Sequence, residues 1–349
     1  MHVLSSEENA KKMVTKVAIN GFGRIGRLAL RAIVESKRKD IQVVAINDLG
    51  TPDFNAHLLQ YDSIHGQFPY KVKSSKTSIN AGLGPIKIFS ERNPEDLPWE
   101  KLDVDVVMEC TGIFTDKAKA SLHINAGAKR VLISAPSKDA DITVVYGVNH
   151  KKIRKSHKVI SNASCTTNCL APVAMVLDKL CGINQGYMTT VHAFTGDQAI
   201  LDTLHSDKRR ARSASQSIIP TSTGAAKAVG LVLPQLLGKL DGTAVRVPTP
   251  NVSMIDLVFN AKKKVTVEEI NQAMVKISSG PLKGVLNVSD EPLVSIDYNH
   301  NPASSTFDLT QTEVIGGKLG RVLSWYDNEW GFANRMSDTA SVIGKLIKN

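Results

Sequence analysis

Apolar runs alternate with amphipathic stretches through the first half of the chain. Between the first two runs, Ile25, Leu28, Ala29, Ala32 and Ile33 recur at helical spacing, which predicts a helix over 22–36. Six short runs rich in β-branched residues predict buried strands, at 14–21, 41–48, 103–112, 130–136, 142–149 and 157–164. Strands that alternate with helices are typical of a doubly wound parallel sheet of the Rossmann type, so we expect an α/β fold here.

The pattern changes after position 165. A predicted helix reaches about Leu180, and a second one, from Thr266 to about Ser278, opens with a capping box between Thr266 and Glu269. Long strand-like runs fill most of the remainder, at 185–194, 242–263 and 316–327. This half is therefore expected to be an α+β domain with a mostly antiparallel sheet.

The length of 349 residues is too great for one ordinary core and indicates two domains. The change of pattern places the first domain at 1–164 and the second at 165–330. The amphipathic stretch at 331–349 predicts a C-terminal helix, which we assign to the first domain. The polar segment 1–13 lies outside every motif, and we expect it to be dispensable.

Composition narrows the function classes. The hydrophobic content of 42% and charged content of 22% are typical of a globular protein. A net charge of +10 suits nucleic acids or small anions, but 5% aromatic residues provide few stacking platforms, so nucleic acid is not expected as a main partner. No apolar run approaches the ~20 residues of a membrane span, and no signal peptide is visible. Four cysteines are too few for a disulfide scaffold, which favours a cytoplasmic location.

A glycine-rich loop follows the first predicted strand and opens the first predicted helix. Gly21, Gly23 and Gly26 match the G-x-G-x-x-G spacing of dinucleotide-binding proteins. The first allows a tight turn, the second lets backbone approach a pyrophosphate, and the third lets helix and strand pack closely. Asp48 ends the next strand, where a carboxylate binds ribose hydroxyls and repels a 2′-phosphate. The loop therefore predicts NAD as the cofactor in preference to NADP.

The segment SNASCTTNCLAP presents Cys165 and Cys169 four residues apart. Zinc would need more ligands, a redox pair usually has the C-x-x-C spacing, and a buried inert thiol is the ordinary alternative. Ser164 is a suitable N-cap, so Cys165 would be the first residue of a helix, where the helix dipole lowers a thiol pKa. Pro172 fits this helix poorly because it removes a hydrogen bond. No metal is predicted.

A nucleophilic thiol needs a base nearby. His192 lies within a predicted strand, between TTV and a segment with hydroxyl and carboxylate groups. A lone histidine is usually structural, but this context makes His192 a candidate base.

These motifs resemble the phosphorylating glyceraldehyde-3-phosphate dehydrogenases, in their NAD-dependent bacterial form. The resemblance covers about residues 14–349 and is carried by KVAINGFGRIGR, ASCTTNCLAP, TGAAKAVG, RVPTPNVS and SWYDNEWG. It implies a glycolytic or gluconeogenic enzyme in which Cys165 attacks the aldehyde and His192 takes the hydroxyl proton. Hydride passes to NAD, and phosphate releases the resulting thioester as 1,3-bisphosphoglycerate. It also implies a homotetramer, with 165–330 as the catalytic and tetramer-interface domain and the first domain as the NAD-binding one.

The resemblance also assigns two phosphate sites and further cofactor contacts. The phosphate of the substrate is expected at Thr195 and Arg246, with Asp197 nearby. Inorganic phosphate is expected at Ser164, Thr166, Arg210, Thr223 and Gly224. The additional cofactor contacts are Arg24, Ile25, Arg92, Thr111, Ser134 and, at the nicotinamide amide, Asn328. Arginine forks, hydroxyls and glycine N–H groups suit phosphate oxygens.

Two departures and three alternatives accompany this resemblance. Gly196 replaces an asparagine common among bacterial relatives, and Thr203 with Leu204 replaces a Leu-Pro pair of many strictly NAD-dependent members. The second departure makes strict rejection of NADP less secure. Erythrose-4-phosphate dehydrogenase shares the Cys and His but releases its acyl group to water, and aspartate-semialdehyde dehydrogenase is a more distant alternative. RNA binding is the third alternative, as a secondary role only, in the dinucleotide cleft.

Overall fold

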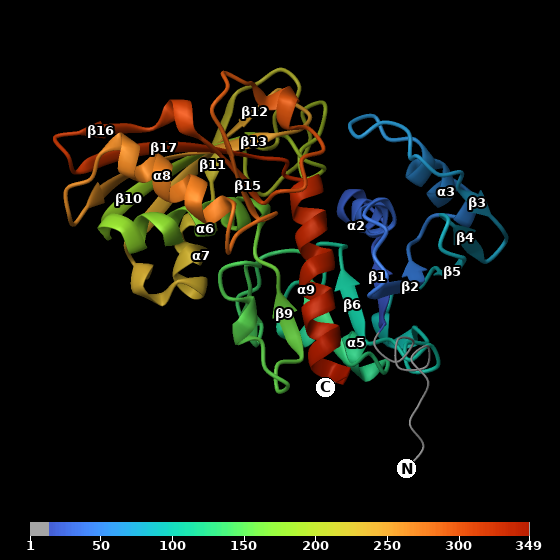
Figure 1. Cartoon of the computed structure of the whole chain (residues 1–349). Helices are drawn as coiled ribbons and strands as arrows, with labels where there is room; N and C mark the ends of the chain where they lie inside the picture. The colour runs from blue at the N-terminus through green and yellow to red at the C-terminus, as the bar shows by residue number, and fades with distance from the viewer. Residues whose placement is uncertain (1–13, 349) are drawn as a thin grey trace, which may run out of the picture. The chain divides into compact units, whose positions relative to one another are not determined.

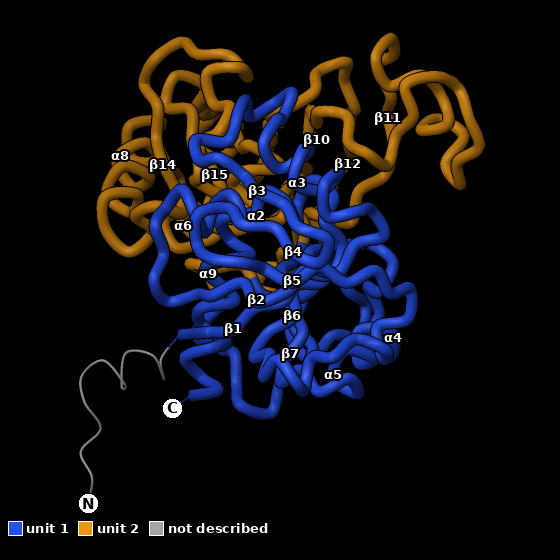
Figure 2. The backbone as a smooth tube through the Cα atoms, turned by 90° about the vertical axis from the view of Figure 1, so that its right-hand side faces the viewer, with its two compact units in different colours: residues 1–144, 150–163, 333–349 blue, residues 145–149, 164–332 orange. Residues whose placement is uncertain are grey.

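The computed structural model describes residues 14–348, so the predicted N-terminal extension lies outside the described residues. The chain divides into two compact units, coloured separately in Figure 2. Unit 1 contains the described residues up to Val144, His150–Ala163 and those from Ala333 onward, and unit 2 contains Val145–Asn149 and Ser164–Phe332. No helix in the described part of the chain is long and apolar enough to cross a membrane.

Unit 1 is built on a nine-stranded sheet, and its central strands are buried on both faces because helices flank them (Figure 1). In spatial order the strands are β3 (Lys73–Ser74), β4 (Ser78–Asn80), β5 (Pro85–Phe89), β2 (Ile41–Asn47), β1 (Thr15–Asn20), β6 (Val106–Glu109), β7 (Arg130–Ile133), β9 (Val159–Ser161) and β8 (Ile142–Thr143). All neighbouring pairs are parallel except β3–β4 and β4–β5. The chain leaves β1 for β2 on one side and later reaches β6 on the other. Ligands of such sheets bind at this switch point.

The helices of unit 1 are α2 (Arg24–Glu35), α3 (Pro52–Gln60), α4 (Lys117–Ala120), α5 (Leu122–Asn125) and the part of α9 (Trp330–Lys348) that follows Phe332, with 3₁₀ turns at Pro94–Asp96 and His150–Lys152. The prediction of a parallel sheet is confirmed. The strand predicted at 142–149 is wrong beyond Thr143, because the chain turns there and Gly147 takes a φ of +86°.

Unit 2 is built on an eight-stranded, mostly antiparallel sheet, as predicted. Its strands in order are β11 (Ile219–Ser222), β12 (Leu240–Val247), β10 (Ile183–Ala193), β13 (Ser253–Ala261), β17 (Leu319–Tyr326), β15 (Ser305–Asp308) and β14 (Leu286–Ser289), with β16 (Glu313–Ile315) paired to β17. Only the β10–β12 and β14–β15 pairs are parallel. Burial alternates along β13, which shows that one face of the sheet is covered more deeply than the other.

Three helices pack against this sheet: α6 (Cys165–Cys181), α7 (Ala225–Val232) and α8 (Val267–Ser278) (Figure 1). The remaining short elements are 3₁₀ turns at Pro234–Leu236, Ser295–Tyr298 and Leu309–Gln311. The predicted capping box of α8 is present. The single run predicted at 242–263 is instead two strands, because Pro248 and Pro250 lack the N–H that a strand needs. Helix α7 was not predicted.

Candidate active site

The glycine loop joins β1 to α2. Gly21 has a φ of +86°, and a Cβ there would lie 2.8 Å from the backbone nitrogen of Thr111. A Cβ on Gly26 would lie 2.1 Å from the Gly21 carbonyl oxygen, so this glycine is required for close packing of helix and loop. A Cβ on Gly23 would meet nothing within 4 Å, so Gly23 faces open space that a ligand can enter.

The start of α2 has no side-chain cap. Gly23 is the N-cap residue and has no side chain to accept from the first N–H groups, and the first turn contains no acidic residue. A helix start of this kind can bind a phosphate through its N–H groups and the helix dipole. Asp48 supports the loop, because its two carboxylate oxygens accept from the N–H groups of Phe22 and Gly50, each at 2.9 Å. These features fit the pyrophosphate and ribose of a dinucleotide.

A cavity of about 460 Å³ lies beside this loop within unit 1. It brings together five of the predicted cofactor residues: Gly21, Gly23, Asp48, Arg92 and Thr111. Sequence reasoning missed the other lining residues, Asn20, Asn47, Leu49, Glu91, Cys110, Ile113 and Phe114. The sequence did contain one signal for these residues, since Asn20 and Asn47 are polar residues that end two predicted parallel strands. In the structure they are register partners, and their side chains form a 2.8 Å hydrogen bond.

The four other predicted cofactor residues of unit 1 do not line this cavity. The guanidinium of Arg24 makes two hydrogen bonds to the Asp62 carboxylate, at 2.6 and 3.1 Å. Burial by itself would raise the pKa of Asp62. The hydrogen bonds from Arg24 and from the N–H groups of His65 and Ile64 outweigh burial and lower this pKa to about 2. Gly26 contributes packing, Ile25 is half-buried in α2, and Ser134 follows β7. Arg24 therefore uses its side chain to hold the segment after α3.

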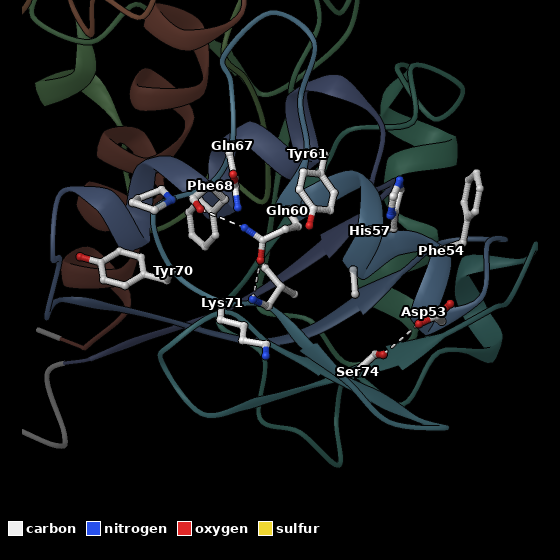
Figure 3. Close-up of a pocket in the computed structure, with 13 residues that line it drawn as sticks. Asp53, Phe54, His57, Gln60, Tyr61, Gln67, Phe68, Tyr70, Lys71 and Ser74 are labelled. Atoms are coloured by element: carbon white, nitrogen blue, oxygen red, sulfur yellow. Dashed lines mark hydrogen bonds between the residues drawn. The ribbon is translucent and has the colours of Figure 1, made fainter.

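Unit 1 has a second concavity, of about 550 Å³, between α3 and the segment before β3 (Figure 3). The side-chain amide of Gln60 holds its rim by donating to the Phe68 carbonyl at 2.9 Å and accepting from the Val72 N–H at 2.8 Å. No residue that the sequence predicted for the site lines this concavity.

In unit 2, helix α6 begins at the candidate nucleophile, as predicted. Ser164 is the N-cap residue, and its hydroxyl accepts from the Thr167 N–H at 3.0 Å. Cys165 is therefore the first helical residue and is half-buried. The helix continues through Pro172 to Cys181, where Gly182 with a φ of +70° ends it.

His192 lies near the end of β10, with its Nε2 atom 3.5 Å from the Cys165 Sγ atom. Its Nδ1 atom lies 2.6 Å from the Ala193 carbonyl oxygen, which can only accept a hydrogen bond. Nδ1 therefore carries a hydrogen, and in the neutral ring Nε2 is left free to take a proton from the thiol. The ring is almost fully buried, and the ring of Tyr326 packs edge-on against it.

Burial and the surrounding charges and hydrogen bonds have opposite effects on the pKa of the Cys165 thiol. Burial raises the pKa of the Cys165 thiol, while the positive charge of Arg246 and hydrogen bonds from Thr166 oppose it. The lowered thiol pKa predicted from the helix start is therefore wrong, because burial outweighs the contributions that lower it. Burial and Arg246 lower the pKa of His192 to about 3. Proton transfer from Sγ to Nε2 creates opposite charges that attract by about 5 kcal/mol at an effective dielectric constant of about 20. Thiolate formation at Cys165 is thus coupled to His192.

Two arginines lie close to the thiol–imidazole pair, and their charges act on it. Arg246 donates to the Ala193 carbonyl at 3.2 Å and to the Thr195 hydroxyl at 3.3 Å. Arg210 donates to the Asp197 carboxylate at 2.9 Å, and its charge also lowers the pKa of His192. An incoming phosphate would therefore compete with Asp197 for Arg210.

The remaining predicted phosphate residues lie at two adjoining helix starts. Thr167, in the first turn of α6, donates to the carbonyl of Ala225, the first residue of α7, at 3.2 Å. Ser164 and Thr166 thus lie close to Thr223 and Gly224, which precede α7. Gly224 is the N-cap residue, and a Cβ there would meet nothing within 4 Å. The sequence prediction missed Thr167, which joins the two helix starts.

The last predicted residue, Asn328, is buried after β17 and accepts from the Ser253 hydroxyl at 2.8 Å. Tyr326 was missed by the sequence prediction. Its hydroxyl lies 2.9 Å from those of Thr166 and Thr190, so it joins the start of α6 to β10.

A dinucleotide-binding loop in one unit and a thiol–imidazole pair beside arginines in the other define a nicotinamide-dependent oxidoreductase. Two family models match the chain: "Glyceraldehyde 3-phosphate dehydrogenase, NAD binding domain" over residues 15–117, and "Glyceraldehyde 3-phosphate dehydrogenase, C-terminal domain" over residues 164–328. The chain belongs to the glyceraldehyde-3-phosphate dehydrogenase family, and its cofactor is NAD.

Relatives match along nearly the whole chain. The glyceraldehyde-3-phosphate dehydrogenase of Xanthobacter flavus is 65% identical over 96% of this chain and 100% of its own length. The enzyme of Cereibacter sphaeroides is 62% identical over 96% of this chain and 100% of its own length. The enzyme of Geobacillus stearothermophilus is 55% identical over 95% of this chain and 98% of its own length. The resemblance stated from the motifs is therefore confirmed.

Proposed function

We propose that this enzyme oxidises glyceraldehyde 3-phosphate with NAD and inorganic phosphate to 1,3-bisphosphoglycerate. The observation that carries the proposal is the 3.5 Å approach of Cys165 Sγ to His192 Nε2, beside two arginines. Unit 1 serves as the NAD-binding domain and unit 2 as the catalytic domain.

In the first step, the Cys165 sulfur forms a bond to the aldehyde carbon as its proton moves to His192 Nε2. The carbonyl oxygen then takes that proton from Nε2 and becomes the hydroxyl of a thiohemiacetal, and the Cys165 N–H, at the start of α6, is a donor for that oxygen. His192 then takes the hydroxyl proton as the carbon is oxidised to a thioester. When bound, NAD supplies the acceptor for the hydride. The backbone carbonyl of Ala193 keeps Nε2 directed at the reacting atoms, because it holds the hydrogen on Nδ1.

The two phosphate sites then have distinct tasks. Arg246 and Thr195, with Asp197 nearby, hold the phosphate of the substrate, since the first two are already in contact with each other. Arg210 and the starts of α6 and α7, with Ser164, Thr166, Thr223 and Gly224, hold the attacking phosphate. That phosphate forms a bond to the thioester carbon, the C–S bond breaks, and Cys165 leaves as the thiolate.

For the cofactor, we assign the pyrophosphate to the glycine loop, with the backbone of Arg24 and Ile25, and the adenosine ribose to Asp48. Arg92, Thr111 and Ser134 contribute from the remainder of unit 1, and Asn328 of unit 2 binds the nicotinamide amide. The Asp48 carboxylate supports a preference for NAD because it would repel a 2′-phosphate.

We also propose a homotetramer. The segment after the site exposes four large aliphatic side chains, and one of them, Leu204, is 99% exposed. The four are Ile200, Leu201, Leu204 and Ile218. Exposed apolar side chains gathered on one segment are typical of a protein interface. Sedimentation of the purified protein tests this assignment, and a monomer would contradict it.

We further propose a cytoplasmic location. All four cysteines are free thiols, which suits a reducing compartment. Fractionation of cells that produce the protein tests it, and recovery in an exported fraction would contradict it.

The test of the reaction is NADH formation from glyceraldehyde 3-phosphate, with and without inorganic phosphate. We expect sustained turnover only with phosphate, and a burst of about one NADH per active subunit without it. Steady turnover without phosphate would mean that water accepts the acyl group, as in erythrose-4-phosphate dehydrogenase. The same assay with erythrose 4-phosphate compares the two aldehydes directly.

A further inference from the structure

Ser253 is the first residue of β13 and is fully buried. Its hydroxyl oxygen accepts from the Ala193 N–H at 3.0 Å, and the same hydroxyl donates to the Asn328 Oδ1 atom at 2.8 Å. One hydroxyl thus contacts the residue after the candidate base and the side chain proposed for the nicotinamide amide.

The direction of these bonds orients the Asn328 amide. The Ser253 hydroxyl has a single hydrogen, and among the described residues Asn328 Oδ1 is the acceptor within hydrogen-bond distance. With Oδ1 held in this way, the Nδ2 group is the part of the amide that can donate to a ligand. A carboxamide carbonyl oxygen is a suitable acceptor for it.

The second bond holds the backbone that orients His192. The Ala193 N–H contacts Ser253, and the Ala193 carbonyl accepts from His192 Nδ1 and from Arg246. Movement of this backbone would therefore move the acceptor that directs Nε2 toward Cys165.

The segment that places Ser253 is itself strained. Val252 has a φ of +69°, which is costly for a β-branched residue. The side-chain amide of the preceding Asn251 holds this conformation by donating to Asn299 Oδ1 at 2.7 Å and to Asp327 Oδ2 at 2.9 Å. Strain of this kind persists where the surrounding contacts over-determine the position, and here they determine the position of one hydroxyl.

We propose that Ser253 is a positioning residue that orients both His192 and Asn328, so that base and nicotinamide are aligned by the same hydroxyl. The proposal rests on the proposed function. Ser253 contacts neither substrate nor cofactor, and it acts through Ala193 and Asn328.

The test compares Ser253→Ala with Ser253→Thr, which restores the hydroxyl, and with Ser337→Ala as a matched control. Ser337 is also a buried serine, but among residues 14–348 its hydroxyl donates to the Ala333 carbonyl within its own helix, α9. We expect kcat of Ser253→Ala to fall by about tenfold to a hundredfold. The KM for inorganic phosphate should stay within about twofold of the wild-type value, because the residues proposed to bind this phosphate are not held by Ser253. Ser253→Thr should regain most of the rate.

Two binding measurements do not depend on turnover. NAD should bind Ser253→Ala about fivefold more weakly, whereas ADP-ribose, which lacks the nicotinamide, should bind it as it binds the wild type. Alkylation of Cys165 by iodoacetamide in the cofactor-free protein should slow by about fivefold, because His192 is misdirected. If Ser253→Ala does not fold, the same measurements are made on Ser253→Cys. This substitution keeps a side chain of similar size and weakens both hydrogen bonds.

The outcomes separate this inference from the proposed function. If the wild type shows phosphate-dependent turnover and Ser253→Ala matches Ser337→Ala in every measurement, the positioning role is wrong. Equal weakening of NAD and ADP-ribose would likewise overturn it. If the wild type lacks that turnover, the proposed function fails, whereas the alkylation rates still report on Ser253 and His192.

Discussion

Helices α2 and α6 both begin at proposed site residues, but their first turns satisfy the free N–H groups differently. At α2 the N-cap residue is Gly23, which has no side chain to accept from these groups. At α6 the N-cap residue is Ser164, whose hydroxyl accepts from the Thr167 N–H. At the first helix start the N-cap residue occupies none of the N–H groups, whereas at the second the N-cap hydroxyl occupies the Thr167 N–H.

This difference follows from what each helix start must hold. A ligand that comes and goes needs donors that no side chain occupies, and the open space at Gly23 provides access to them. A nucleophile is part of the chain, and its position is fixed better when the cap locks the first turn. Substitutions at α2 should therefore affect cofactor binding, and substitutions at α6 should affect thiol chemistry.

The largest effect is expected at the thiol. Cys165→Ser should lower turnover by roughly four orders of magnitude, because the hydroxyl is a much weaker nucleophile at neutral pH, while NAD binding persists. Turnover and NAD affinity are measured on the same preparation. Cys181→Ala, at the other end of α6, is the control and should keep turnover within about threefold. Comparable loss in both variants would mean that the helix, and not the thiol, is responsible.

His192→Asn should slow Cys165 alkylation at neutral pH by about tenfold to a hundredfold. Without His192 the thiol loses its proton acceptor, and burial holds its pKa above the ordinary value of 9.0. The thiolate forms as pH rises through the pKa, so a raised pKa means less thiolate at neutral pH. The alkylation rate of this variant should therefore still be rising above about pH 9. A pH profile identical to that of the wild type would show that His192 does not control the thiol.

Two alanine substitutions in the glycine loop separate packing from binding. Gly26→Ala should destabilise the protein by about 2–3 kcal/mol, because its Cβ would meet the Gly21 carbonyl oxygen. Gly23→Ala should leave the free energy of unfolding nearly unchanged and weaken NAD binding about tenfold, because the methyl group fills open space. Denaturant unfolding and NAD titration measure the two effects. Normal NAD affinity in Gly23→Ala would remove the pyrophosphate from this position.

The smallest effect is expected at the cap of α6. Ser164→Ala should lower the free energy of unfolding by about 1 kcal/mol and slow Cys165 alkylation severalfold. Thr266→Ala, which removes the equivalent cap from α8, is the control with a similar stability loss. Its alkylation rate should equal that of the wild type. If both variants alkylate at the wild-type rate, the cap contributes stability alone.

The local parts of the site could be predicted from sequence. Gly21, Gly23, Gly26 and Asp48 lie within one strand–helix–strand unit, where spacing alone determines their neighbours. Ser164 and Cys165 could be placed at a helix start for the same reason. The parallel and antiparallel sheets followed from the change of pattern after position 165.

Contacts between distant segments could not be predicted. Tyr326 meets Thr166 across 160 positions because α6 packs against β17. Ser253 meets Ala193 across 60 because β13 and β10 are neighbours in the sheet of unit 2. The pairing of Arg24 with Asp62 was missed because a motif reports the backbone of a loop and not the partners of its side chains. Asn20 and Asn47 required the strand register.

The central claim is that Cys165 carries the acyl group between oxidation and phosphate attack. Intact-mass spectrometry of the enzyme, quenched after mixing with NAD and glyceraldehyde 3-phosphate without inorganic phosphate, tests it most directly. We expect one phosphoglyceroyl group per active subunit, located on the Cys165 peptide and lost when phosphate is added. NADH formation with no acyl group on Cys165, or with the group on another residue, would contradict it.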